Sequence, residues 1–312
     1  MVLASRKEVV AVKHLVEDRL LGLPGVFAVD VARKEVGGQE TGEDAIVVWV
    51  RDKRDDVPDG QRIPSEIHGV PTDVVQGEIV LSDAMPAEQL ALDTLVGGLS
   101  LGPCSRHEAG TLGVVVPVTG YGLMALTNYH VAGPTPGSPV TTVTQPALPD
   151  GGDCPGTVIG HVFRGSLGQP SNVDAALVIG NGTREARPNE VLAIGQVQGV
   201  DVTFPGDHVQ KVGRTTGRTT GVVVSDEFSL AVHYPVFGPM QFTRQITVRN
   251  DVQGQPFQAP GDSGAVLVND DRELVGLMFA VARNASGVEY GVANPIQDVL
   301  RALDLRTTIR SI

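Results

Sequence analysis

Apolar residues near the start of the chain recur at the spacing of an amphipathic helix. They return every three or four positions along one helical face, at Val9, Val12, Leu15, Val16 and Leu20. This pattern stops before Gly22, which favours the end of a helix. Apolar runs at 26–31, 45–50 and 74–81 follow, and each is short enough to form one strand. The pattern therefore predicts a small α/β module over residues 1–98.

The rest of the chain alternates short apolar runs with turns rich in glycine and proline. Runs of this length, bounded by such turns, are typical of short antiparallel strands. They fall into two groups, separated by a polar, proline-bearing stretch at 181–190. A final apolar pattern over 295–305 predicts a closing helix with proline in its first turn. We therefore expect a mainly β protein with further domains at 99–185 and 186–312.

Charge and composition narrow the classes of partner. The 312 residues carry a formal net charge of −12, which argues against nucleic acid or an anionic membrane as partner, since both favour a basic surface. No apolar run approaches the length of about 18 residues expected of a transmembrane helix. The first 20 residues mix acidic, basic and apolar side chains and do not form the pattern of a secretion signal.

The two cysteines are too few for a disulfide framework in a chain of this length, so we expect a reducing, cytoplasmic location. A zinc set can be imagined from Cys104, His107, Cys154 and His161. The spacing of the second pair is too loose for a zinc signature, and ordinary structural roles are the simpler interpretation. We expect no metal and no organic cofactor.

The most informative stretch is Gly261-Asp262-Ser263-Gly264, directly before an apolar run. A serine between glycines lets a substrate carbonyl approach the backbone closely. The amides of Gly261 and Ser263 can then point at one spot, as an oxyanion hole requires. The alternative is an ordinary surface turn, because all four residues favour turns.

A serine hydroxyl needs a base, and that base needs an orienting acceptor. His130 ends an apolar run, and Asp174 stands at the head of another. A carboxylate beside a buried strand is costly unless it is paired. Taken singly, a histidine at a strand end and an acid at a turn each have a plain structural explanation. Taken together with Ser263, they supply the three groups of a catalytic triad.

These segments resemble those of trypsin- and chymotrypsin-like serine proteases. The order His, Asp, Ser is that of chymotrypsin rather than subtilisin. The similar motifs are Leu126-Thr127-Asn128-Tyr129-His130-Val131, Val173-Asp174-Ala175-Ala176 and Gly261-Asp262-Ser263-Gly264. A further segment, Lys211-Val212-Gly213-Arg214-Thr215-Thr216-Gly217, is similar to the start of the second barrel in streptogrisins. Near the N-terminus, Leu23-Pro24-Gly25-Val26 and the segment 63–74 resemble a cytosolic branch that includes plant narrow-leaf proteins.

The resemblance implies two six-stranded antiparallel β-barrels of the chymotrypsin type. Residues 99–185 would carry His130 and Asp174, and 186–312 would carry Ser263 and the closing helix. His130 would then act as the base, Asp174 would hold its imidazole, and Ser263 would be the nucleophile. Secreted relatives usually have a cysteine next to this histidine, where Val131 stands in this chain.

The resemblance also suggests residues around the triad. Lys211 would neutralise Asp262, although an exposed lysine is the plain alternative. The substrate pocket would be lined by Phe257, Phe279, Ala280 and Val281. None of these is acidic, so we expect an apolar or small residue before the scissile bond. Phe279 also stands where many relatives place a serine that touches the catalytic aspartate.

The sequence thus favours a serine endopeptidase that acts on protein or peptide substrates. The alternative is a latent or non-catalytic scaffold that keeps the protease fold and binds peptides or partners. The N-terminal module carries no catalytic constellation, so we interpret it as an assembly or regulatory element. A homo-oligomer would be consistent with that role.

Overall fold

The computed structural model describes residues 4–36, 39–54, 56–76, 86–135, 141–284 and 288–305. The chain divides into two compact units, Met1–Ala84 and Met85–Ile312. This division falls earlier than the boundary at residue 98 suggested by the sequence. The reason is that β5 (Thr94–Gly97) pairs in parallel with β13 (Glu185–Val191), deep in the second unit.

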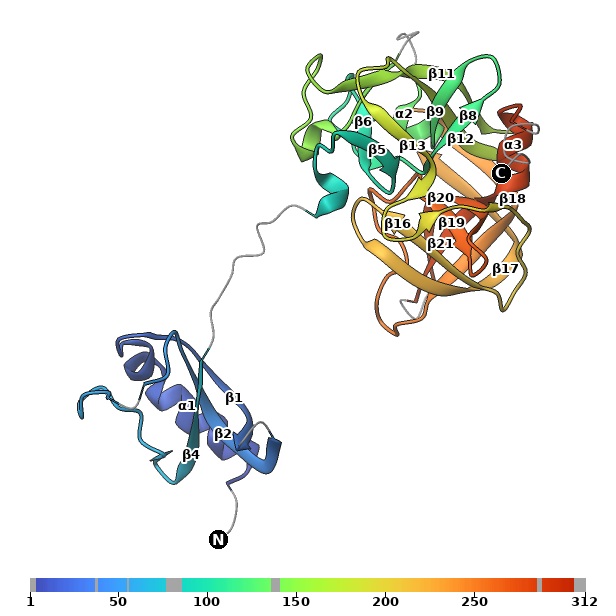
Figure 1. Cartoon of the computed structure of the whole chain (residues 1–312). Helices are drawn as coiled ribbons and strands as arrows, with labels where there is room; N and C mark the ends of the chain where they lie inside the picture. The colour runs from blue at the N-terminus through green and yellow to red at the C-terminus, as the bar shows by residue number, and fades with distance from the viewer. Residues whose placement is uncertain are drawn as a thin grey trace. The chain divides into compact units, whose positions relative to one another are not determined.

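The first unit packs one helix on a small sheet (Figure 1). Its elements are α1 (Arg6–Leu21), β1 (Val26–Val36), β2 (Gln39–Val50), β3 (Glu66–Ile67) and β4 (Val70–Gln76). The strand order is β1-β2-β4-β3, with β1 antiparallel and β4 parallel to β2. Val9 and Leu20 of the helix are buried against Ile46 and Val48 of β2. The expected strand over 74–81 is described only as far as Gln76; the rest of it lies outside the described residues.

The first barrel of the second unit is a seven-membered sheet that curls so that its two ends meet. Its strands are β6 (Ser100–Pro103), β7 (Gly110–Thr111), β8 (Val114–Val118), β9 (Gly122–Thr127), β10 (Thr142–Thr144), β11 (Val158–Gly168) and β12 (Val173–Gly180). The order is β7-β6-β10-β11-β12-β9-β8. Only Leu112 and Gly113 separate β7 from β8 along the chain, so these two act as one bent strand and the barrel has six sides. The short helix α2 (Tyr129–Ala132) follows β9, and the 3₁₀ turns η1 (Ala87–Gln89) and η2 (Leu148–Asp150) lie in the connections.

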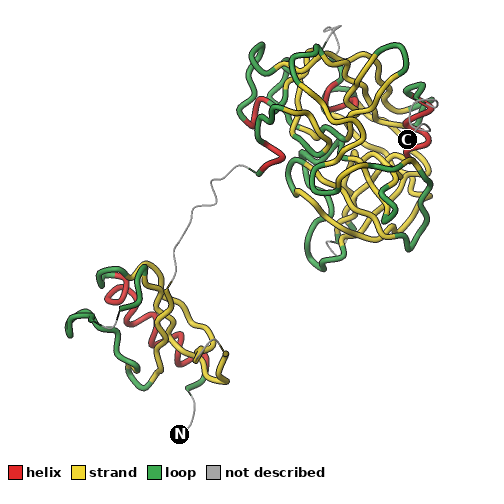
Figure 2. Tube along the Cα trace, in the orientation of Figure 1, coloured by secondary structure: helices red, strands yellow, loops and turns green. Residues whose placement is uncertain are grey.

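The second barrel is closed by hydrogen bonds. Its strands are β16 (His208–Gly213), β17 (Gly217–Tyr234), β18 (Gly238–Asn250), β19 (Val266–Asn269), β20 (Glu273–Arg283) and β21 (Glu289–Pro295). They run in the order β20-β19-β16-β17-β18-β21, and a β20–β21 pairing completes the ring. The short strand β15 (Gly199–Val200) adds to β20, and β14 (Gly195–Gln196) adds to β13. The helix α3 (Ile296–Ala302) follows β21. Figure 2 shows these strand-rich barrels, which confirm the mainly β, double-barrel fold expected from the sequence.

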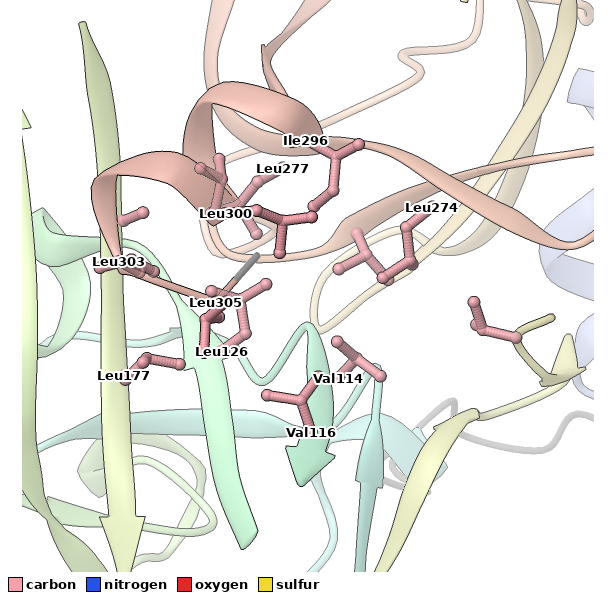
Figure 3. Packing of buried hydrophobic residues seen from close by; sticks show 14 of the residues in the cluster. Val114, Val116, Leu126, Leu177, Leu274, Leu277, Ile296, Leu300, Leu303 and Leu305 are labelled. Carbon is pink, nitrogen blue, oxygen red and sulfur yellow. The ribbon is translucent and has the colours of Figure 1, made fainter. Parts of the chain in front are cut away.

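The two barrels and α3 share one hydrophobic core. Leu126 and Leu177 of the first barrel, Leu277 of the second and Leu300 of α3 are all buried in one cluster (Figure 3). Burial of apolar surface stabilises such an interface by about 25 cal/mol per Å². The barrels therefore have little freedom to move apart, and residues contributed from both sides can hold a fixed geometry.

A long hairpin extends from the second barrel. Its strands are β17 and β18, and a short turn joins Tyr234 to Gly238, which has φ +81° and begins β18. Tyr234 at the end of β17 is 6% exposed and packs in a cluster with Phe242 and Phe279. The same cluster includes Leu167 of β11, so the hairpin contacts the first barrel.

The two cysteines, which are too few for a disulfide framework, form a single disulfide between Cys104 and Cys154, with Cα atoms 6.0 Å apart. Their sulfurs are therefore not available as thiolate ligands, and the imagined zinc set with His107 and His161 is not formed. Across the described ranges, no three His, Cys, Asp or Glu side chains gather in a way that could hold a metal ion. Nor does any helix of the described chain have the length and apolar character to cross a membrane.

Candidate active site

The turn that carries Ser263 can form only with glycine on either side of the Asp-Ser pair. Gly261 has φ +102° and Gly264 has φ +97°, which side chains rarely tolerate. A Cβ atom on Gly261 would collide with the Thr215 hydroxyl, and one on Gly264 with the Thr111 carbonyl. The turn therefore lies in close contact with both barrels, and Ser263 at its tip stays partly exposed.

The carbonyl groups of this turn are held away from its amides. Pro260 O accepts a hydrogen bond from Thr215 Oγ1 at 2.8 Å, and Asp262 O accepts one from the Ala265 N–H at 3.0 Å. In a trans peptide the N–H points opposite to the C=O. The N–H groups of Gly261 and Ser263 have no acceptor among the described residues. Two adjacent unpaired donors are what an oxyanion hole requires.

Asp262, between these donors, is buried and paired with a buried lysine. Lys211 Nζ lies 3.3 Å from Asp262 Oδ2, and both side chains are fully buried. The carboxylate also accepts hydrogen bonds from the backbone N–H groups of Thr215 and Thr216, at 2.8 and 3.1 Å. Two further donors are the Thr216 hydroxyl at 2.6 Å and the Ala259 N–H at 2.9 Å. Burial lowers the pKa of Lys211, and the Asp262 charge opposes that change.

The loop that follows Lys211 also joins the two barrels. The Arg214 guanidinium forms an ion pair with Asp150 of the first barrel, and its Nε lies 2.8 Å from Asp150 Oδ2. This carboxylate raises the pKa of Arg214. The Arg214 N–H donates to Thr111 Oγ1 at 3.0 Å, the hydroxyl that holds Gly261 O. The serine turn is therefore fixed by contacts from both barrels.

His130 and Asp174 meet at the start of α2. Asn128 precedes the helix and donates through Nδ2 to Asp174 O at 2.6 Å. Asp174 Oδ1 accepts the His130 backbone N–H at 3.0 Å, and Asp174 Oδ2 lies 2.5 Å from His130 Nδ1. Asp174 is fully buried, whereas the His130 side chain is 23% exposed. The carboxylate thus orients the imidazole, and Nε2 is left to act as a base.

Two residues of the second barrel also hold Asp174, and neither was identified from the sequence. Tyr234 Oη donates to Asp174 Oδ2 at 2.8 Å. Asn294 Oδ1 accepts the Asp174 N–H at 3.0 Å, and its Nδ2 donates to Gln245 Oε1 at 2.6 Å. The one available signal was Phe279, because a phenylalanine at that position removes the donor that many relatives have. Burial, together with the Asp174 charge, raises the pKa of Tyr234 well above its ordinary value.

The strand β7 brings the serine turn and α2 together. A Cβ atom on Gly110 would lie 2.9 Å from Ser263 O and would also contact the Val131 side chain. The N–H of Thr111 donates to Ser263 O at 2.7 Å. Ser263 Oγ donates to Phe279 O at 3.4 Å. Ser263 and His130 both lie in the described part of the chain, and no hydrogen bond joins their side chains there. Hydrogen bonds of this kind are often loose without substrate and tighten in its presence.

Arg106 holds the far end of α2. Its guanidinium donates to the carbonyls of His130, Val131 and Gly133 at 3.0–3.1 Å. Arg106 stands two residues after Cys104, so the disulfide anchors the segment that carries it. In this chain, the segment with Arg106 supports the loop that carries His130. Secreted relatives usually have a cysteine next to the histidine of this loop, and this chain does not.

The expected pocket residues have different environments. Phe257 is 1% exposed and packs in the core of the second barrel, with Lys211 Nζ 5.8 Å from its ring centroid. Phe279 is also buried, packing on Phe242, whereas Val281 is 40% exposed. The side of β20 that a substrate can reach therefore begins near Ala280 and Val281, and contact of the four residues with substrate stays a prediction.

The chain is similar to known proteins over more than half of its length. A model of the trypsin family matches residues 124–303, more than half of the chain. Three solved structures resemble the chain in fold. Chymotrypsin from Cellulomonas bogoriensis is 21% identical, with 67% of this chain and 95% of that chain covered, at TM-score 0.46. Protease A from Thermobifida fusca is 17% identical, with coverages of 67% and 95%, at TM-score 0.48. Nocardiopsis protease is 19% identical, with coverages of 68% and 97%, at TM-score 0.47.

At these identities the likeness concerns the fold alone. A comparison with curated protein sequences finds no match. The family match begins after residue 98, so the resemblance of the first module to the narrow-leaf branch stays a prediction.

Proposed function

Because the chain belongs to the trypsin family, we propose that it is a serine endopeptidase whose triad is His130, Asp174 and Ser263. The observation that carries the proposal is the pairing of Asp174 with the His130 backbone N–H and with His130 Nδ1, close to a serine turn with two unpaired N–H donors. Family membership supports protein or peptide substrates. The double-barrel fold supports the same chemistry.

The proposed reaction is acyl transfer through a covalent intermediate. The Ser263 hydroxyl turns from Phe279 O toward His130, and its oxygen bonds to the peptide carbonyl carbon as Nε2 takes the proton. The imidazolium then gives that proton to the leaving amine as the C–N bond breaks. Water attacks the acyl-enzyme by the same route, His130 again moves the proton, and Ser263 is regenerated. Asp174 stays ionised and stabilises the imidazolium.

The oxyanion would be bound by Gly261 and Ser263. Donors fixed before the reaction begins need no reorganisation in the transition state. Thr215 and Ala265 supply that preorganisation by holding the carbonyls of Pro260 and Asp262, whose peptides carry the two N–H groups. The Lys211–Asp262 pair also supports the proposal, since it fixes Asp262, the residue between the two N–H donors.

We propose that the residue before the scissile bond is apolar or small. The residues predicted to line this pocket, Phe257, Phe279, Ala280 and Val281, include no acid that would attract lysine or arginine. Digestion of a peptide library by the full chain tests this. Cleavage mainly after arginine or lysine would contradict it.

Labelling with a fluorophosphonate probe tests the function itself. We expect the wild-type chain to be labelled, and Ser263→Ala and His130→Ala to lose labelling, because loss of a triad member removes a factor of about 10⁴–10⁶ in rate. Ser229→Ala, which changes an exposed serine of β17, is the matched control and should be labelled normally. A folded wild-type chain that resists the probe would favour the latent or scaffold alternative.

A further inference from the structure

We propose that Tyr234 is a positioning residue of the active site, whose phenol fixes the Asp174 carboxylate so that Oδ2 faces the His130 imidazole. This inference rests on the proposed function and assigns part of that site to the β17–β18 hairpin. Tyr234 does not touch the reacting atoms. It acts through Asp174.

The contacts of the carboxylate define this role. Oδ1 is held by the His130 backbone N–H, whereas Oδ2 receives both His130 Nδ1 and the Tyr234 hydroxyl. Rotation of the carboxylate would break all three contacts at once. Without the phenol, Oδ2 would be held by the imidazole alone, the group whose position it is meant to determine.

The phenol is suited to this task because it is buried and stays protonated. Tyr234 is 6% exposed, and Asp174 Oδ2 is the acceptor of its hydroxyl. A buried hydroxyl without an acceptor costs free energy, so this hydrogen bond also fixes the rotamer of the ring. The pKa of Tyr234 is raised by burial and by the Asp174 charge, so the phenol remains a donor at neutral pH.

The hairpin gives Tyr234 a rigid support. Its ring centroid lies 5.4 Å from that of His130 and 6.4 Å from that of Phe242. Phe237 in the hairpin turn packs on Tyr129, the residue before His130, with centroids 5.5 Å apart. The hairpin therefore contacts both members of the His–Asp pair and the residue beside them, from the opposite barrel.

The groups around Asp174 determine how loss of the Tyr234 hydroxyl changes the pH dependence of the rate. The titratable groups in contact with its carboxylate are His130 from α2 and Tyr234 from β17. The side chains that bond its backbone, Asn128 from the first barrel and Asn294 from β21, are neutral. A phenol that donates to Oδ2 withdraws charge from that oxygen. Removing the donor leaves Oδ2 a stronger acceptor for Nδ1–H, which favours the protonated imidazole.

The test is Tyr234→Phe, which keeps the ring and removes only the hydroxyl. We expect kcat on a peptide substrate to fall about tenfold to a hundredfold, an effect of the size that loss of a hydrogen bond to a charged group produces. We expect KM to change little and the acidic limb of the pH–rate profile to move to higher pH. Tyr121→Phe, at a 55% exposed tyrosine in another part of the fold, is the matched control and should leave both unchanged.

A second measurement does not depend on activity. In a Ser263→Ala background, the His130 imidazole signal is followed by NMR against pH, with and without Tyr234→Phe. We expect the midpoint of the His130 signal to move to higher pH in the double variant. If wild-type enzyme is active but Tyr234→Phe changes neither kcat nor this midpoint, the positioning role is wrong and the proposed function stands. Failure of the wild type to react with the fluorophosphonate would overturn the proposed function instead.

Discussion

Two fully buried aspartates stand on either side of the proposed reaction centre, and they are stabilised in different ways. Asp262 faces the ammonium group of Lys211 and accepts four further hydrogen bonds from Ala259, Thr215 and Thr216. Asp174 has no such cation in contact among the described residues. Its partners are an imidazole, a phenol and one backbone N–H.

The difference indicates a structural role for the Asp262 carboxylate and a role in the proposed reaction for the Asp174 carboxylate. Around Asp262 the charge is balanced by a paired lysine in the resting protein, so the pair can fix the turn before substrate binds. Around Asp174 the balancing charge would appear only when His130 takes a proton. A resident cation at Asp174 would remove the need for that charge and so weaken the base. The contrast predicts that damage at Asp174 will chiefly affect rate, and damage at Asp262 chiefly stability.

The largest expected effect is at Asp174. Asp174→Asn should lower kcat by about 10⁴, because the amide favours the wrong imidazole tautomer. The free energy of unfolding should change far less than the rate. Steady-state kinetics and urea unfolding on the same preparation measure both, with Asp226→Asn on β17 as the matched control. A loss of stability with kcat retained would remove the distinction between the two carboxylates.

The next effect is at Lys211. Lys211→Met leaves the Asp262 charge buried and uncompensated, and should lower the free energy of unfolding by about 3–5 kcal/mol. The double variant Lys211→Met with Asp262→Asn should recover part of this loss, because it removes the charge as well. Urea unfolding curves give the comparison. Equal stability of wild type and Lys211→Met would mean that the pair does not hold the turn.

A smaller loss of stability is expected when the disulfide that anchors the Arg106 segment is removed. Replacing both cysteines by serine, Cys104→Ser with Cys154→Ser, should lower the free energy of unfolding by about 2–4 kcal/mol, since the bond closes a loop of 50 residues. Alkylation followed by mass spectrometry on freshly lysed cells shows whether the bond forms there. Disulfides persist mainly in oxidising compartments, so this measurement also tests the expected cytoplasmic location.

The smallest effect concerns alkaline pH. The pKa of Tyr234 is raised in the folded chain, so above about pH 10 the unfolded chain loses its phenol proton first. The unfolded state then binds fewer protons, and stability must fall as pH rises from that value. Thermal unfolding between pH 9 and 11 should show a shallower decline for Tyr234→Phe than for wild type. Identical slopes would mean that the phenol is not held by Asp174.

Much of this site could be anticipated from local sequence, because its parts are short motifs on turns. The glycines around Ser263 and the acid at the head of β12 are visible without a fold, and the double barrel expected from the resemblance is confirmed. Tyr234 could not be anticipated, since its contact with Asp174 depends on the length and bending of β17. The Cys104–Cys154 bond was missed for a related reason. Fifty residues separate the two cysteines, and only the folded barrel brings them together.

The position of Asn294 has a consequence for the timing of biosynthesis. Two of the groups that hold Asp174 are synthesised after it, Tyr234 by 60 residues and Asn294 by 120 residues. A nascent chain therefore lacks the Tyr234 and Asn294 contacts of Asp174 until β17 and β21 have been synthesised. The proposed active site of each chain is therefore completed only after the second barrel has been synthesised, because Tyr234, Ser263 and Asn294 all belong to it.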